Sequence, residues 1–148
     1  MMDEHAQVEA RIRGSFAKQG LMATLGAVLG DIAPGAVEIL LPASSAVSQQ
    51  HGFVHAGAVS AIADTAAGYA ALSLMPAGHG VLTTEFKINL IAPAVGDRIV
   101  ARGRVVKAGR TLTLAVAEVF ADRAEERKLV AFLTATMMSM EQRGDITD

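Results

Sequence analysis

Residues 49–72, QQHGFVHAGAVSAIADTAAGYAAL, decide which fold this chain can adopt. The stretch opens with polar residues and a glycine, which suit a loop, and from Ala56 it becomes alanine-rich and almost free of charge. Alanine has the highest helix propensity, and apolar residues occur around the whole helical circumference. We therefore expect a long helix that begins at Ala56 and is buried on all sides.

One charged residue, Asp64, interrupts this apolar helix. A buried carboxylate is costly unless it is paired, hydrogen-bonded or used in chemistry. Positions three, four and seven residues away share its face of the helix and carry only small side chains: Gly57, Ser60, Ala61, Ala67, Gly68 and Ala71. The bulky residues fall on the opposite face: Val59, Ile62, Tyr69 and Leu72. The pattern predicts a shallow strip that admits a ligand or a second backbone; alternatively, Asp64 only anchors a neighbouring loop.

The segment before this helix predicts a helix followed by a β-hairpin. Residues 3–19 have apolar residues at helical spacing, and Gly20 is expected to close that helix. Residues 22–32 and 36–41 are apolar and flank a Pro34-Gly35 turn. We therefore expect these two runs to pair as strands.

The segment after the central helix predicts four strands. Apolar and polar residues alternate with the period of a strand over residues 82–90, 98–107, 111–120 and 129–140. The alternation in the first run indicates one covered face. Short turns between successive strands favour an antiparallel sheet, and a helix apolar all round favours a sheet wrapped around it. We predict one α+β domain over residues 1–148, with a frayed polar tail over residues 141–148.

Composition excludes several classes of protein. Lys and Arg number 13 against 15 Asp and Glu, which argues against a nucleic-acid-binding protein that relies on bulk charge. Cysteine is absent, so disulfides, cysteine-ligated zinc and thiol nucleophiles are excluded. Residues 56–76 are apolar, but Asp64 near their centre argues against a membrane span. The N-terminus has no signal-peptide pattern, and we predict a cytoplasmic protein.

The central stretch is similar to the signature of a known family. The spacing of Gln49, His55, Ala56-Gly57 and Asp64 resembles that of hot-dog acyl-CoA thioesterases of the PaaI-like (phenylacetate-degradation) group. The resemblance extends over roughly residues 20–140 and includes EFKINLIAPA, residues 85–94. Two positions depart from the family pattern: Ala56 replaces a glycine, and Gly68 falls where a polar residue is common.

The resemblance implies hydrolysis of coenzyme A thioesters without a metal or cofactor. Asp64 would act as the nucleophile or as the general base on water, and Thr83 matches a position that holds this water in some relatives. Gln49 and His55 would orient the carbonyl or the water. The backbone amides of Ala56 and Gly57 would polarise the carbonyl oxygen; helix N-termini provide such donors.

Helix geometry adds a condition to this assignment. At about 1.5 Å per residue, Asp64 lies roughly 13 Å along the helix from His55, too far to share one carbonyl with it. Two antiparallel copies bring the N-terminus of one helix to the middle of the other. We therefore predict a site shared between subunits of a homodimer or homotetramer, with Lys107 and Arg110 contacting the coenzyme A phosphates and, after them, Arg104 and Arg123.

Other readings of the sequence remain open. The chain is alternatively a non-catalytic module that binds acyl-CoA or an acyl group, or a hot-dog dehydratase, although no matching hydratase arrangement occurs. His51 and His55 are four residues apart, but Gly52 lies between them and no third metal ligand is placed nearby. The sequence does not separate aromatic from aliphatic acyl groups.

Overall fold

A computed structural model describes residues 2–141 of the chain. Its elements are α1 (Glu4–Phe16), α2 (Gly20–Leu25), β1 (Val28–Ala33), β2 (Ala36–Pro42), the 3-10 turn η1 (Ser45–Val47), α3 (Ala56–Leu72), β3 (His79–Leu90), β4 (Arg98–Ala108), β5 (Leu112–Arg123) and β6 (Glu126–Glu141). The predicted tail lies outside the described residues, except for Glu141, which ends β6. No described helix combines the length and apolarity needed to cross a membrane.

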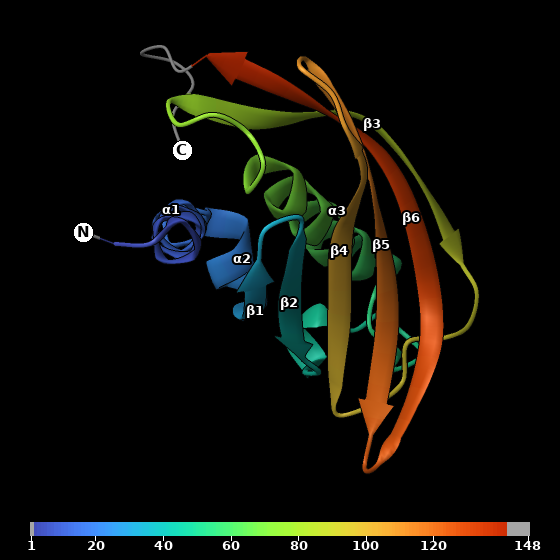
Figure 1. Cartoon of the computed structure of the whole chain (residues 1–148). Helices are drawn as coiled ribbons and strands as arrows, with labels where there is room; N and C mark the ends of the chain where they lie inside the picture. Colours follow the sequence, from blue (N-terminus) through green and yellow to red (C-terminus); the bar gives the residue numbers. More distant parts are fainter. Residues whose placement is uncertain (1, 142–148) are drawn as a thin grey trace.

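The strands form one antiparallel sheet in the order β1-β2-β4-β5-β6-β3. The sheet curves around α3, which lies against its concave face (Figure 1). This confirms the predicted α+β arrangement of a sheet wrapped around a central helix. β3 and β4 follow one another in sequence but do not pair, because residues 91–97 carry the chain from the β3 edge to the middle of the sheet.

The central helix begins where the sequence predicted. His55 is its N-cap, and the alanine-rich run continues to Leu72 without a break. α3 lies very close to β4 at Gly103, where an added Cβ would lie 2.2 Å from the Ala66 carbonyl oxygen. Glycine is required here because any side chain would collide with the helix backbone.

The expectation that α3 is buried on all sides is wrong for its N-terminal half. Ser60, Ala61 and Asp64 remain partly accessible, whereas Ala67 and Ala71 are fully buried. The sheet curves around α3 (Figure 1), but these partly accessible residues show that it leaves the strip around Asp64 uncovered. The small-residue strip is therefore open around Asp64 and closed toward the C-terminal end of α3.

The N-terminal segment differs from the prediction. The helix expected over residues 3–19 is α1, which ends at Phe16, but Gly20 begins a second helix, α2, instead of closing the first. α2 ends at Gly26, whose φ of 78° is the left-handed conformation that favours glycine at a helix end. The strand expected from residue 22 therefore starts only at Val28. Arg11 of α1 donates to the carbonyls of Leu72, Met75, Pro76 and His79, which ties this segment to the C-terminal end of α3.

β3 does not have the covered face that its alternation predicted. Leu82, Phe86 and Leu90 are 46%, 42% and 55% exposed. The reason is the position of β3 at the edge of the sheet, where α3 contacts it at Thr83 but leaves these three side chains uncovered. A β-bulge between Thr83 and Glu85 also shifts the alternation within the strand. An edge strand with exposed large apolar residues marks a surface that another chain can cover.

Candidate active site

Asp64 lies half-buried on α3 and faces the edge strand. Its Oδ1 accepts a hydrogen bond of 2.7 Å from Oγ1 of Thr83 on β3. Burial raises the pKa of Asp64 above the ordinary value, and the hydrogen bond from Thr83 opposes that rise. A carboxylate whose pKa is raised by desolvation is a stronger base than one in water, which is a property required of a general base.

A hollow of 260 Å³ surrounds the Asp64 carboxylate. It is lined by Gln19, Asp64, Thr65, Gly68, Tyr69, Val81, Leu82 and Thr83. Tyr69, which was expected on the opposite face of the helix, therefore borders the same hollow, and its hydroxyl accepts a 2.7 Å hydrogen bond from Gln19 Nε2. No local pattern indicated Gln19, because the pairing joins residues 50 positions apart.

The N-terminus of α3 holds His55 in a defined orientation. Nδ1 of His55 accepts a 2.7 Å hydrogen bond from the Gly57 N–H. The neutral imidazole then carries its proton on Nε2, which is left as a donor. The Gly57 N–H, predicted to polarise a carbonyl, is directed to the histidine ring in this structure. The N–H of Ala56 has no acceptor among the described residues, as is usual in the first turn of a helix.

Gln49 is fixed by the loop that precedes the helix. Its Oε1 accepts from the N–H groups of His51, at 2.5 Å, and Phe53, at 3.3 Å. With the side-chain oxygen engaged, the Nε2 group is the part of the amide left to donate to a ligand. Gln49, His55 and Ala56 thus present three hydrogen-bond donors at one end of α3.

These donors share a second hollow, which is separate from the one around Asp64. It has a volume of 460 Å³ and is lined by Gln49, Gln50, Phe53, Val54, His55, Ala56, Val59, Leu90, Ile91, Ala92, Pro93, Ala94 and Val130. The walls are mainly apolar, with the polar groups grouped at the helix N-terminus. Donors at such a terminus suit a carbonyl oxygen that gains negative charge.

The structure thus divides the predicted site residues into two groups. Asp64 and Thr83 are in contact, and Gln49, His55, Ala56 and Gly57 lie together, but no residue lines both hollows. Strand pairing links Thr83 through Met137 and Thr113 to Ala108, so the neighbouring Lys107 lies at the Thr83 end of the sheet, across three strands. Lys107 and Arg110 are exposed in the β4–β5 hairpin and line neither hollow.

Comparison with known proteins decides the family. The sequence model of the Thioesterase superfamily matches residues 51–128, which include all of α3 and the strands β3, β4 and β5. The chain belongs to the Thioesterase superfamily. A carboxylate with a raised pKa and a donor-rich pocket are the groups that thioester hydrolysis requires, so the site agrees with this assignment.

Several solved structures resemble this thioesterase. A thioesterase family protein from Silicibacter pomeroyi is 49% identical, with a TM-score of 0.89 over 91% of this chain and 99% of that chain. The E. coli PaaI protein from the phenylacetic acid degradation operon is 20% identical, with a TM-score of 0.83 over 98% and 100%. A thioesterase from Haemophilus influenzae is 20% identical, with a TM-score of 0.78 over 86% and 87%. The last two comparisons support the fold alone.

These findings confirm the predicted hot-dog fold, the PaaI-like resemblance and the enzyme class, a thioester hydrolase. Within residues 2–141, no three His, Asp or Glu side chains gather closely enough to hold a metal ion.

Proposed function

We propose that this thioesterase hydrolyses acyl-coenzyme A at a site shared by two copies of the chain. One observation carries the proposal: the carboxylate and the hydrogen-bond donors lie in separate hollows, nine residues apart on one rigid helix. That separation is roughly 13 Å, whereas the atoms of one reacting thioester lie within a few ångströms of each other. A partner helix running in the opposite direction supplies what each hollow lacks.

The proposed mechanism uses Asp64 of one subunit and the donors of its partner. As general base, Asp64 removes a proton from water while the water oxygen attacks the thioester carbon. As nucleophile, it attacks that carbon directly, and water then cleaves the resulting anhydride. In both routes the carbonyl oxygen becomes an oxyanion, the C–S bond breaks and coenzyme A leaves as the thiol.

The donor group has distinct tasks in this proposal. The Ala56 N–H, the Nε2–H of His55 and the Nε2–H of Gln49 hydrogen-bond to the carbonyl oxygen as charge develops on it. Gly57 contributes by holding the imidazole ring through its N–H. Thr83 orients the carboxylate through the 2.7 Å bond to Asp64 and places the attacking water beside it.

The free edge of the sheet supports association with a second copy. β3 has a neighbouring strand on one side only, and Phe86 and Leu90 are exposed beside the open strip of α3. Pairing of β3 with the same strand of a partner would satisfy its unpaired backbone groups and cover these side chains. We propose a homodimer, or a homotetramer built as a dimer of dimers, with each chain folded as a single domain over residues 1–148.

Coenzyme A also presents phosphate groups that require cations. Lys107 and Arg110 are the proposed contacts from the subunit that supplies Asp64, because strand pairing puts their hairpin at the Thr83 end of the sheet.

A thiol-release assay over aromatic and aliphatic acyl-coenzyme A esters tests the activity. We expect turnover of at least one class, and the preferred class identifies the acyl group. If no ester releases thiol while the same esters raise the Tm of the protein, the chain is a binding module and the hydrolase proposal fails.

Complementation tests the shared site. His55→Asn keeps a residue that can cap α3 but removes the imidazole donor, and Asp64→Asn removes the base. Each variant alone should be nearly inactive. Co-refolding the two should restore up to about a quarter of parent activity, because half of the dimers are mixed and one of their two sites is intact. If the co-refolded mixture is no more active than the two variants refolded separately and then combined, each subunit carries a complete site.

A further inference from the structure

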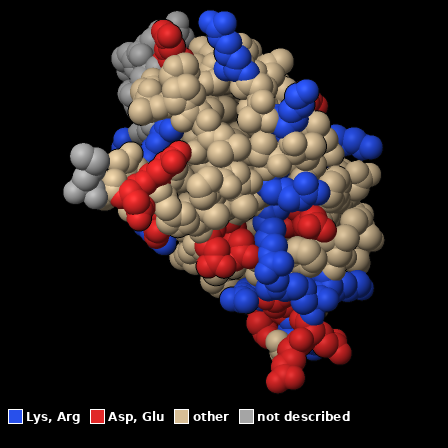
Figure 2. Space-filling model, in the orientation of Figure 1, with Lys and Arg blue, Asp and Glu red and all other residues tan. Residues whose placement is uncertain are grey.

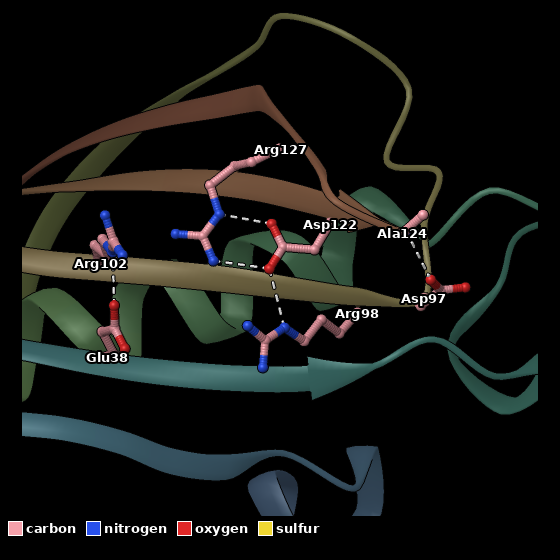
Figure 3. A network of polar contacts seen from close by, with 7 residues as sticks. All are labelled: Glu38, Asp97, Arg98, Arg102, Asp122, Ala124 and Arg127. Carbon is pink, nitrogen blue, oxygen red and sulfur yellow. Dashed lines mark hydrogen bonds and ion pairs between the residues drawn. The ribbon is translucent and has the colours of Figure 1, made fainter.

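Four cationic side chains lie at the β5–β6 hairpin and the adjoining start of β4: Arg98, Arg123, Arg127 and Lys128. Two of them, Arg98 and Arg127, are neutralised on the convex face of the sheet. Asp122 accepts hydrogen bonds from Arg98, at 2.9 Å, and from Arg127, at 2.6 and 2.7 Å (Figure 3). The bonds from Arg127 and then Arg98, with their positive charges, lower the pKa of Asp122 to about 2. This carboxylate is therefore charged at all ordinary pH values and holds both guanidinium groups.

The other two cations, Arg123 and Lys128, face the opposite side of the sheet. Strand pairing puts Asp122 opposite Arg127, so the neighbouring pairs Ala121–Lys128 and Arg123–Glu126 point to the concave face. Among the described residues, neither Arg123 nor Lys128 has a carboxylate within ion-pair distance. The hairpin projects at the lower end of the molecule, where Figure 2 shows acidic and basic side chains gathered together.

Arg123 and Lys128 line a hollow of 290 Å³ that adjoins the donor pocket of α3. The other lining residues are Phe53, Pro93, Val95, Ala121 and Glu126. Phe53 and Pro93 border both hollows, so the two spaces share a wall. A ligand that starts at His55 and runs past Phe53 thus meets an apolar passage first and two cations next.

The hairpin that carries these cations is braced against the preceding loop. Ala124, whose φ of 53° forms the tight turn, donates its N–H to Oδ2 of Asp97 at 3.2 Å (Figure 3). The Asp97 N–H donates to the Asp122 carbonyl at 2.7 Å, and an added Cβ at Gly96 would lie 2.5 Å from the same oxygen. These contacts hold the Arg123 backbone in place before any ligand binds, which lowers the entropic cost of binding.

From this geometry we infer that Arg123 and Lys128 bind the phosphate groups of coenzyme A in the subunit that supplies His55. The inference rests on the proposed function, because coenzyme A is the substrate carrier assumed there. The thioester end lies at the donors of α3, the pantetheine arm passes Phe53 and Pro93, and the phosphates reach the cationic hollow. Glu126 weakens the site, since its carboxylate lies beside the phosphates.

The experiment compares two esters of the same acyl group, one of coenzyme A and one of N-acetylcysteamine, which has no phosphate. The variants are Arg123→Gln, Lys128→Gln and their combination, and Arg13→Gln on α1 is the control for loss of one positive charge. The double variant should raise KM for the coenzyme A ester by about three- to tenfold at low salt, and less at high salt. Its kcat/KM for the N-acetylcysteamine ester should equal that of the parent.

Glu126→Gln sharpens the test because it should act in the opposite direction. Removing this carboxylate should lower KM for the coenzyme A ester and leave the other ester unaffected. If the Arg123 and Lys128 variants keep the parent KM for coenzyme A, or change both esters equally, the inference is wrong while the hydrolase proposal stands. If the parent cleaves neither ester, the proposed function fails and this inference fails with it.

Discussion

The two hollows on α3 differ in the kind of group that each contains. The hollow at the helix N-terminus is rich in donors, with Gln49, His55 and Ala56 directing N–H groups into a mainly apolar space. The hollow at mid-helix contains an acceptor, the half-buried carboxylate of Asp64, with Thr83 donating to it. The first suits an oxyanion and the second suits an attacking water, so in the proposed mechanism the groups for thioester hydrolysis are divided between two places on one helix.

This difference is the basis for proposing that one 17-residue helix serves a two-subunit site. Because α3 runs from one hollow to the other, an antiparallel partner helix would align its donors with the carboxylate, and the proposed dimer would contain two equivalent sites. The open, small-residue strip around Asp64 and the exposed edge strand allow that approach. Substitutions in either hollow, in the packing of α3 between them or in the cationic β4–β5 hairpin should therefore have distinct effects.

The largest effect is expected from Asp64→Asn, which removes the carboxylate from the mid-helix hollow and leaves the donors at the N-terminus of α3 in place. Loss of the nucleophile or base should lower kcat by about 10² to 10⁴-fold.

The same variant should be more stable than the parent at neutral pH. Burial raises the pKa of Asp64 in the folded state, so the free energy of unfolding of the parent falls as pH rises through that pKa, whereas the asparagine side chain of the variant never ionises. Thermal melts should show a Tm advantage for the variant that grows from acid to neutral pH; an advantage that shrinks would contradict this account.

Gly103→Ala should disturb both hollows at once by displacing α3 from β4. The added Cβ would overlap the Ala66 carbonyl, and the helix has to move or the strand has to bend. We expect a loss of about 3 kcal/mol in the free energy of unfolding, measured by urea denaturation. Gly14→Ala is the matched control, since nothing lies within 4 Å of its added Cβ and alanine favours the helix. Equal stability for the parent and the Gly103 variant would argue against this close packing.

Thr83→Val should affect the acceptor side alone and more mildly. Valine keeps the shape of threonine but cannot donate to Asp64, so the carboxylate loses the bond that lowers its pKa. Activity requires the ionised form and is lost as pH falls through the pKa of Asp64. The acid limb of the kcat profile should therefore move to higher pH, and kcat at neutral pH should fall about tenfold. A profile that stays in place would show that Thr83 does not act through Asp64.

The smallest effect is expected from Lys107→Ala combined with Arg110→Ala. Both side chains are exposed in the β4–β5 hairpin, where solvent screens their charge. KM for an acyl-coenzyme A ester should rise about two- to fivefold with little change in kcat. An unchanged KM would show that this hairpin does not bind the phosphates. The cations in the subunit that supplies His55, Arg123 and Lys128, would then be the remaining candidates.

The local part of the site was accessible from the sequence. The spacing of His55 and Asp64 on an alanine-rich run predicted the helix, its N-cap region and the lone carboxylate, because these features depend on residues less than ten positions apart. The contacts of Gln19 with Tyr69 and of Thr83 with Asp64 were not derivable from such patterns. They join residues 50 and 19 positions apart and exist only once the N-terminal helices and β3 have packed against α3.

The sequence by itself determined the central helix, the strand segments and the antiparallel character of the sheet, since propensity and periodicity are properties of neighbouring residues. Only the tertiary structure decided the strand order, and with it the exposure of β3, whose alternating pattern is that of a covered strand. It also decided that the donors and the carboxylate open into separate hollows. The burial of a residue depends on which element packs against its strand or helix. The residue pattern shows which face of a strand or helix is apolar, but it does not show which element covers that face.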